Sequence, residues 1–377
     1  MTKKLLYDRT LITIVLIILG FGLIMVFSAS ISISKEVYNS QSAIFTRQLL
    51  AVILGLVALL ITMKIDYRFY QRPSVVYTLV GLSMALLIYV LMTPSVVGVQ
   101  RWIRFGFINF QPSEIAKLVV IIFSSFYLTK KKEQLNSFSR GLLPFLLIVG
   151  TIIILVAVEP DLGTAISIGI TAGFLLFIGG LYWRYIIASS LIASLLIYLM
   201  IINTPYRMNR ILAFLYPEKD LYGIGYQVHQ SLISIGSGGM TGLGFAQGKQ
   251  KLFFVPEPHT DFIFAVVGEE LGLLGCLLVL ILFGLLFWKS IQIAIRAKTP
   301  FGTLLGLGIG STIVFQALIN VSVTLGLVPA KGLPLPFISV GGSSMILMLS
   351  AIGILLNISS QTRSQDSKGG WIKIADA

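Results

Sequence analysis

The sequence predicts an all-α integral membrane protein, a polytopic bundle of about ten transmembrane helices. Its 377 residues are 56% hydrophobic and only 11% charged, whereas an ordinary soluble domain is about a quarter charged. Apolar stretches of roughly 20 residues, the length of a transmembrane helix, recur between the charged residues. The alternating segments of about ten residues that mark an outer-membrane barrel are missing. Helices are favoured in lipid because each one satisfies its own backbone hydrogen bonds.

Ten apolar stretches are long enough to span a bilayer. They lie at about 11–30, 45–63, 74–92, 113–129, 141–158, 163–181, 185–203, 262–288, 302–325 and 340–360. The fifth and sixth are separate because Pro160 interrupts any continuous helix between them. A signal peptide is the alternative for residues 1–30. That run is longer than a typical signal core and its end is only weakly cleavage-like, so we interpret it as an uncleaved first span.

The distribution of Lys and Arg predicts that both termini are cytoplasmic. With ten spans and the N-terminus inside, 17 of the 28 basic residues but only five of the 15 acidic residues fall on the cytoplasmic side. The net charge of +13 is therefore mostly a topology signal, and we expect no nucleic-acid partner. Residues 1–361 are interpreted as a single transmembrane domain, and residues 362–377 as a short polar cytoplasmic tail.

The outer face is predicted to hold the functional groups, at helix ends and in a long loop at about 204–261. A loop of this length is often functional. Its glycines between Gly236 and Gly248 suit either an anion-binding nest or a flexible turn. Asp261 follows at the start of the eighth span, where a carboxylate can simply cap the helix. Glu269 and Glu270 lie deeper, as a proton path or as a structural ion pair.

Other polar residues at the outer face also have two explanations. Glu114 and Lys117 are i,i+3 neighbours that can pair with each other. Trp102 could belong to an interfacial aromatic belt. A zinc site is not expected, because the only histidines are His229 and His259 and no cysteine accompanies them. A Ser-His-Asp hydrolase would need a nucleophile elbow, which the sequence lacks.

The outer segments together resemble the SEDS family (shape, elongation, division and sporulation proteins). The resemblance rests on segments that occur in the family's order: 101–103, 111–114, 159–164, 225–227, 256–265, 268–272, 331–339 and 341–344. Gly268-Glu269-Glu270 and Ala330-Lys331-Gly332 resemble the division members more than the elongation members. Val340 stands where a tyrosine is common, and Glu159 stands where a glutamine is common.

The resemblance implies a peptidoglycan glycosyltransferase at the outer face of the bacterial cytoplasmic membrane, acting at the division septum. The implied substrate is lipid II, a disaccharide-pentapeptide on undecaprenyl diphosphate. The implied partners are a class B penicillin-binding protein, which is a single-span transpeptidase, other divisome proteins and membrane lipids. The family's presumed catalytic aspartate falls on Asp261. A divalent cation, Mg²⁺ or Mn²⁺, that bridges Asp261 to the diphosphate is a further expectation.

The residue chemistry agrees with this reaction. A carboxylate at position 261 can accept the proton of the attacking sugar hydroxyl. The leaving diphosphate needs cations or hydrogen-bond donors where negative charge develops. The expected substrate-binding residues are Arg101, Trp102, Glu114, Lys117, Arg210, Lys249, Lys251, Glu257, Lys331 and Ser343, with Arg104 as a further cation. Glu269 and Glu270 are expected to hold helices together.

Two other functions remain open from the sequence. A lipid II flippase or another export carrier would suit the bundle and its Pro/Gly-broken segments. However, a carrier should show functional groups at both ends of its path, and no inverted repeat is evident. A non-catalytic scaffold that recruits the transpeptidase would leave Asp261 replaceable.

Overall fold

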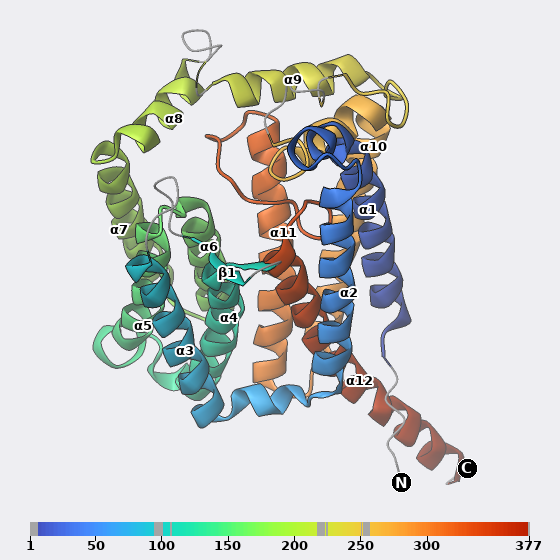
Figure 1. Ribbon diagram of the computed structural model, residues 1–377. Helices are drawn as coiled ribbons and strands as arrows, with labels where there is room; N and C mark the ends of the chain where they lie inside the picture. Colours follow the sequence, from blue (N-terminus) through green and yellow to red (C-terminus); the bar gives the residue numbers. More distant parts are fainter. Residues whose placement is uncertain are drawn as a thin grey trace.

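The computed structural model describes residues 7–93, 101–105, 108–216, 223, 225–249, 251 and 257–375. At 104, 105, 108 and 363–375 it describes the backbone alone. The described chain is a helical bundle, as the composition predicts (Figure 1).

The ten expected spans all coincide with helices. They are α1 Arg9–Tyr38, α2 Ala43–Lys64, α3 Pro73–Met92, α4 Pro112–Lys130, α5 Leu143–Val158, α6 Leu162–Ile178, α7 Trp183–Ile202, α10 Ile263–Ile295, α11 Pro300–Thr324 and α12 Gly342–Ala375. Within the described residues, nine helices are long and apolar enough to cross a membrane. The tenth, α6, is apolar and has 17 residues, which is at the short end of the range for a span. The predicted all-α fold is confirmed.

Four features were not predicted. The expected loop at 204–261 contains two helices, α8 Pro205–Leu215 and α9 Tyr226–Gly238. The segment before α4 forms a hairpin of β1 Ile103–Phe105 and β2 Ile108–Phe110, antiparallel with Ile103 opposite Phe110. Short turns of 3-10 or π-helix (Tyr67–Gln71, Lys132–Gln134 and Phe138–Leu142) complete the connections. The backbone of α12 continues through the described part of the expected tail.

Local sequence explains where the principal helices begin. Asp8 caps α1, its carboxylate accepting from the Leu11 amide at 3.1 Å. Asp161 caps α6 in the same way, accepting from the Thr164 amide at 3.1 Å. Proline at the first helical position starts α3, α4, α8 and α11, where its missing N–H has no cost.

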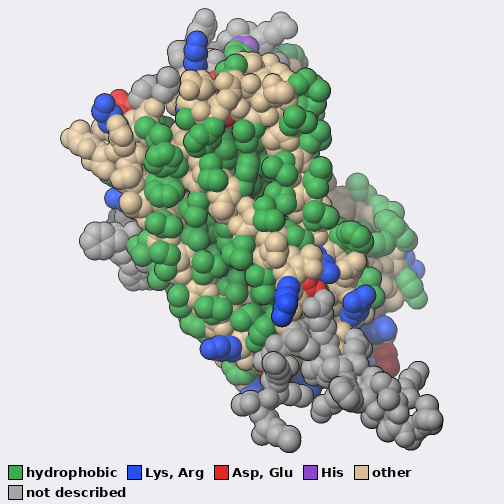
Figure 2. Space-filling view, turned by 90° about the vertical axis from the view of Figure 1, so that its right-hand side faces the viewer, with side chains coloured by type: hydrophobic (Ala, Val, Ile, Leu, Met, Phe, Trp, Pro, Cys, Tyr) green, Lys and Arg blue, Asp and Glu red, His purple; other side chains and the backbone are tan. Residues whose placement is uncertain are grey.

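The helices of the bundle differ in how much of their surface is buried. Most residues of the apolar stretches of α4, α11 and α12 are buried inside the protein, whereas those of α7 are not. Helix α2 packs along α12, and α1, α9 and α11 pack on α10. Figure 2 shows the resulting band of apolar side chains, with Lys and Arg toward its ends. Helices α8 and α9 lie across the end of the bundle away from the chain termini (Figure 1), which we call the distal end.

Candidate functional site

A cavity of about 670 Å³ brings together five of the residues selected from the sequence. Non-helical segments supply about half of its wall: the hairpin with the residues that flank it, the turn before α10 and the loop between α11 and α12. Helices α1, α2, α4, α6 and α12 supply the rest. The five are Arg101, Trp102, Glu114, Glu257 and Asp261.

Backbone hydrogen bonds fix the turn that carries Asp261. The Asn320 side-chain amide on α11 donates to the backbone oxygens of Asp261, at 2.8 Å, and Leu333, at 2.7 Å. The Val340 amide donates to the His259 oxygen at 2.9 Å, and the Ser339 hydroxyl donates to the Thr260 oxygen. The turn is therefore tied to the α11–α12 loop through its backbone. Asp261 does not take the alternative role of a helix cap, since the N-cap of α10 is Phe262, which makes no side-chain capping bond.

Gly332 leaves room for the Asp261 carboxylate. A Cβ at this position would lie only 2.9 Å from Asp261 Oδ2. Any side chain there would have to push the carboxylate away, because real Cβ atoms do not make contacts this short. The glycine beside Lys331 therefore serves the close approach of the loop to Asp261.

The surroundings of Asp261 bring the pKa of its carboxyl group close to neutral pH. Burial, and secondarily the negative charge of Glu257, raise the pKa of Asp261 to about 7, while Arg210 and Arg101 oppose the rise. A carboxyl with this pKa exchanges a proton near neutral pH. Burial lowers the pKa of His259, so the imidazole beside Asp261 is neutral at pH 7, with Nε2 3.8 Å from the Glu257 carboxylate.

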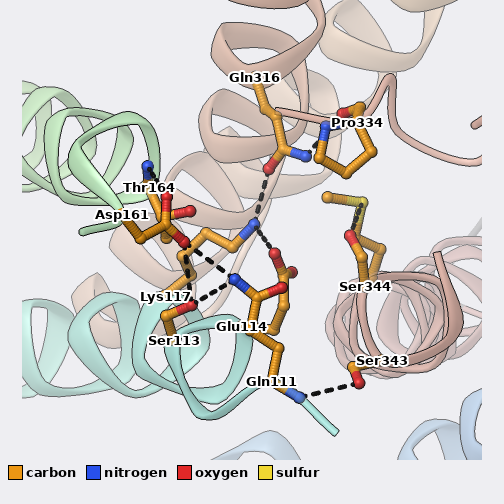
Figure 3. A network of polar contacts seen from close by, with 11 residues as sticks. Gln111, Ser113, Glu114, Lys117, Asp161, Thr164, Gln316, Pro334, Ser343 and Ser344 are labelled. Carbon is orange, nitrogen blue, oxygen red and sulfur yellow. Dashed lines mark hydrogen bonds and ion pairs between the residues drawn. The ribbon is translucent and has the colours of Figure 1, made fainter. Parts of the chain in front are cut away.

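A network of polar contacts lies beneath the cavity (Figure 3). The buried Lys117 ammonium is 2.8 Å from the Glu114 carboxylate and donates to Gln316 Oε1 at 2.7 Å. The Gln316 amide in turn donates to the Pro334 oxygen at 2.8 Å. The predicted i,i+3 pair is thus present, and it joins α4 through α11 to the loop beside Asp261.

A second branch of the network joins the start of α4 to two other elements. Gln111 Nε2 donates to Asp161 Oδ2 at 2.9 Å, so Asp161 binds α4 as well as capping α6. The Ser343 hydroxyl accepts from the Gln111 amide at 3.1 Å and donates to the Asn109 oxygen at 2.8 Å. Ser343 is buried and is absent from the described lining of the cavity. Ser343 thus joins the hairpin to α12, and its contact with substrate stays a prediction.

Two arginines near Asp261 are held by backbone oxygens, and one of them, Arg101, lines the cavity. Arg101 donates to the backbone oxygens of Glu159, at 3.1 Å, and Pro160. Arg210 on α8 donates to the Ala330 oxygen at 3.1 Å, with its guanidinium 4.5 Å from the centre of the Tyr206 ring. Both arginines also oppose the rise in the pKa of Asp261. The side chain of Arg104 lies outside the described residues.

Three predicted lysines do not line the cavity in the described structure. The buried Lys251 ammonium binds Glu270 and the Ser28 hydroxyl, the latter at 2.7 Å. Lys249 is exposed, and its backbone N–H donates to Glu269 at 2.6 Å. Lys331 is partly buried, which lowers its pKa, and it has no hydrogen-bond or ion-pair partner among the described side chains.

A kink in α10 explains where Lys249 and Lys251 lie. Gly272 adopts a φ of 65° inside the helix, a conformation that favours glycine. The displaced carbonyls of Glu269 and Glu270 accept from the amides of the glycine-rich segment, Leu243 at 2.9 Å and Gly244 at 3.0 Å. The side chains of Glu269 and Glu270 also bind amides of this segment. The expected anion nest is therefore occupied by the chain's own carboxylates, which hold helices together as predicted.

Polar amides within apolar spans are the site residues that sequence analysis missed. Gln48 on α2 donates to the Ser339 oxygen at 3.1 Å and accepts from the Gly341 amide at 3.1 Å. Gln316 and Asn320 on α11 bind the same loop. The sequence does contain a signal for these residues, namely a side-chain amide within an apolar helix. Burying a polar group in lipid costs free energy, so such an amide needs a hydrogen-bond partner.

The described residues do not fit a resident metal site. No three His, Cys, Asp or Glu side chains among them converge as ligands. The divalent cation expected at Asp261 together with the diphosphate stays a prediction, and we derive no step through a metal.

Comparisons with known proteins agree with this geometry. The model of the FtsW/RodA/SpoVE family, described as "Cell cycle protein", matches residues 9–364. The chain is 38% identical over 361 residues to the probable peptidoglycan glycosyltransferase FtsW of Geobacter sulfurreducens, covering 95% of this chain and 96% of that one. It is 38% identical over 366 residues to the stage V sporulation protein E of Bacillus subtilis, covering 96% and 99%.

Two solved structures share the fold. A chain from a structure described as "Structural coordination of polymerization and crosslinking by a peptidoglycan synthase complex" has a TM-score of 0.78 at 27% identity, covering 95% of this chain and 99% of that one. The rod shape determining protein RodA of Thermus thermophilus has a TM-score of 0.70 at 26% identity, covering 95% and 98%.

The buried pair beneath the cavity leads to a stability prediction. Lys117→Met should lower the free energy of unfolding by about 3 kcal/mol, because it leaves the Glu114 carboxylate buried without its cation. The Glu114→Gln/Lys117→Met double variant should recover a large part of that loss. Thermal unfolding of the purified protein in detergent measures both. Equal midpoints for wild type and Lys117→Met would show that the pair does not stabilise the fold.

Proposed function

The chain belongs to the FtsW/RodA/SpoVE family of cell cycle proteins, and we propose that it is a peptidoglycan glycosyltransferase with its active centre in the Asp261 cavity. Relatives with this printed function align over nearly the whole chain. The assignment depends on one observation, the environment of Asp261. This carboxyl group has a pKa of about 7 and lies beside a cavity at one end of a membrane bundle, on a turn whose backbone is held by hydrogen bonds.

Asp261 acts as the general base. The substrate is lipid II, and the reaction joins a sugar hydroxyl of one lipid-linked unit to the anomeric carbon of another. The bond from that carbon to the lipid diphosphate breaks, and the diphosphate leaves with the electron pair. Asp261 takes the hydroxyl proton as the new bond forms, a contribution of about 100- to 10,000-fold in rate.

Positive charge near Asp261 stabilises the negative charge that develops on the leaving diphosphate. Arg101 lines the cavity, and Arg210 is close enough to influence Asp261. Because both guanidinium groups are held by backbone oxygens, they are already oriented before substrate binds. Trp102 and Glu257, which are exposed and line the same cavity, are available to the sugar.

The cellular setting follows from the charge asymmetry and the family. The cavity faces the outer side of the cytoplasmic membrane and both termini face the cytoplasm, supported by the concentration of Lys and Arg on the opposite side. The related structure of a peptidoglycan synthase complex supports a class B penicillin-binding protein as partner. The match to relatives named FtsW supports a role for this protein at the division septum, together with other divisome proteins.

Removing the base tests the function. Asp261→Asn should abolish glycan polymer formation from lipid II by the purified protein with its transpeptidase partner. The variant should still fold, because Asn320 and the α11–α12 loop hold the backbone of the turn rather than the carboxylate. Gel analysis of the polymer measures the activity, and thermal unfolding checks the fold.

The matched control for that experiment is Glu133→Gln, which removes an exposed carboxylate in the turn after α4, at the opposite end of the bundle, and should leave activity unchanged. Equal polymer from wild type and a folded, partnered Asp261→Asn would remove Asp261 from the reaction and favour a scaffold. Transbilayer movement of lipid II in liposomes without polymer would favour a carrier.

The raised pKa of Asp261 predicts the pH profile. The base must be deprotonated, so the polymerisation rate should rise with pH up to about 7 and level off above it. Glu257→Gln should move the midpoint to lower pH, because the Glu257 charge raises the pKa of Asp261. Initial rates between about pH 5.5 and 8.5 measure both effects. A flat profile, or a midpoint that Glu257→Gln leaves in place, would contradict the role of Asp261 as base.

A further inference from the structure

The connection between α6 and α7 carries a cluster of exposed aromatic side chains, at the end of the bundle opposite to the Asp261 cavity (Figure 1). The ring of Phe138, in the turn before α5, stacks on that of Tyr185 with the ring centres 6.4 Å apart. Phe177 at the end of α6 contacts Trp183 at the start of α7, with the ring centres 5.3 Å apart. We call this cluster the aromatic platform and define it as Phe138, Phe177, Tyr182, Trp183, Arg184 and Tyr185. None of these residues has a part in the reaction proposed above.

Hydrogen bonds hold the backbone of the aromatic platform in place. Asn136 Nδ2 donates to the Gly180 oxygen at 3.3 Å, and Asn136 Oδ1 accepts from the Tyr182 amide at 2.9 Å. The Leu181 amide donates to the Leu176 oxygen at 3.1 Å, and the Leu181 side chain is buried. The platform is therefore ordered before any ligand binds, which lowers the entropic cost of binding.

The positive charge of Arg184 is not neutralised within the described part of the chain. Its guanidinium lies 5.2 Å from the centre of the Tyr182 ring and 4.9 Å from that of Tyr185. Such contacts orient a guanidinium but leave its N–H donors available to an anion. Arg140, two residues after Phe138 in the adjoining turn, is exposed as well. Among the described carboxylates none forms an ion pair with Arg184 or Arg140.

Other donors on the aromatic platform also suit an anion. The hydroxyl of Tyr182 and the indole N–H of Trp183 belong to side chains that are 54% and 65% exposed. Together with Arg184 and Arg140 they give this surface two positive charges and several hydrogen-bond donors. A phosphate group, with its negative charge and acceptor oxygens, matches both features.

An apolar stripe continues from the aromatic platform along α7. Ile187 and Leu191 follow Trp183 at i+4 and i+8, so the three side chains lie on one face of the helix. Ile187 and Leu191 are exposed, and no residue of α7 is buried. Leu191 lies about 12 Å from Trp183 along the helix axis. A lipid whose phosphate is at the platform can therefore lay an acyl chain along this stripe.

We propose that the aromatic platform binds an anionic glycerophospholipid such as phosphatidylglycerol, with the phosphate on Arg184 and Arg140 and an acyl chain against Ile187 and Leu191. Basic sites between membrane helices on the cytoplasmic side are suited to anionic head groups. A zwitterionic lipid fits less well, because the two arginines repel its ammonium group. The bound lipid supplies packing contacts to α7, which has no buried residue of its own. The inference goes beyond the proposed function and does not depend on it.

Brominated phosphatidylglycerol tests the inference, because bromine quenches the fluorescence of a tryptophan that it contacts. The full chain is placed in phosphatidylethanolamine nanodiscs that contain increasing small fractions of the brominated lipid. Each protein is compared with the same protein carrying Trp183→Phe, and the difference reports the contact at Trp183. Arg184→Gln should lower the association constant of the brominated lipid about fivefold, as expected for the loss of one charge. The Arg140→Gln/Arg184→Gln variant should lower it further, and Arg184→Lys should keep part of the affinity.

The matched control is Arg72→Gln, which removes an exposed arginine at the same end of the bundle, 5.5 Å from the centre of the Phe69 ring. Its association constant should equal that of wild type. All of these variants change exposed side chains, so they should fold as the wild type does, which thermal unfolding checks.

Equal quenching of Trp183 in wild type and Arg140→Gln/Arg184→Gln would overturn the inference. An equal loss in Arg72→Gln would show that general surface charge attracts the lipid, and it would overturn the inference too. Quenching by brominated phosphatidylethanolamine as strong as that by brominated phosphatidylglycerol would do the same, because it would show contact with the acyl chain without recognition of the head group. None of these results bears on glycan polymerisation, so the proposed function is tested separately.

Discussion

The structure depends on one constraint, that backbone and charged groups which leave a helix inside a membrane bundle must find partners within the protein. At the distal end several non-helical segments meet, and side chains from neighbouring helices satisfy their backbone groups. Asn320, Gln316 and Gln48 hold the α11–α12 loop, and that loop holds the turn before α10. The bonds that make irregular backbone tolerable in lipid therefore also fix the position of Asp261.

Ion pairing distinguishes the structural charged residues from Asp261, the reactive one. Lys117 and Lys251 are buried beside Glu114 and Glu270, and each lysine also binds a side chain far away in the sequence, Gln316 or Ser28. Asp261 has a neighbouring carboxylate instead of a cation in direct contact, and the positive charge of Arg101 and Arg210 offsets burial only in part. A buried carboxyl that is not neutralised by a partner keeps a pKa suited to proton transfer.

The sequence predicts the spans well and selects Asp261, which lines the cavity, but it does not predict the partners of the other charged residues. Span positions follow from apolar length alone, and Asp261 stands out through its place at the start of a span within a recognisable motif. Lys251 looked like a substrate ligand because sequence distance hides its contact with Ser28, 223 positions away. The hairpin and α8 are short elements whose stability depends on tertiary contacts, such as the Ser343 bond to Asn109 and the Arg210 bond to Ala330. Such contacts leave no periodic signal.

The central claim is that these polar groups face the outer side of the membrane, and cysteine accessibility tests it most directly. The chain has a single cysteine, Cys276, which is buried and can be replaced by serine to give a clean background. In spheroplasts, a membrane-impermeant maleimide should label Glu257→Cys, whose native side chain is 62% exposed beside the cavity. It should label Glu133→Cys, in the turn after α4 at the opposite end of the bundle, only after permeabilisation. The reverse pattern would place the Asp261 cavity in the cytosol and contradict the account.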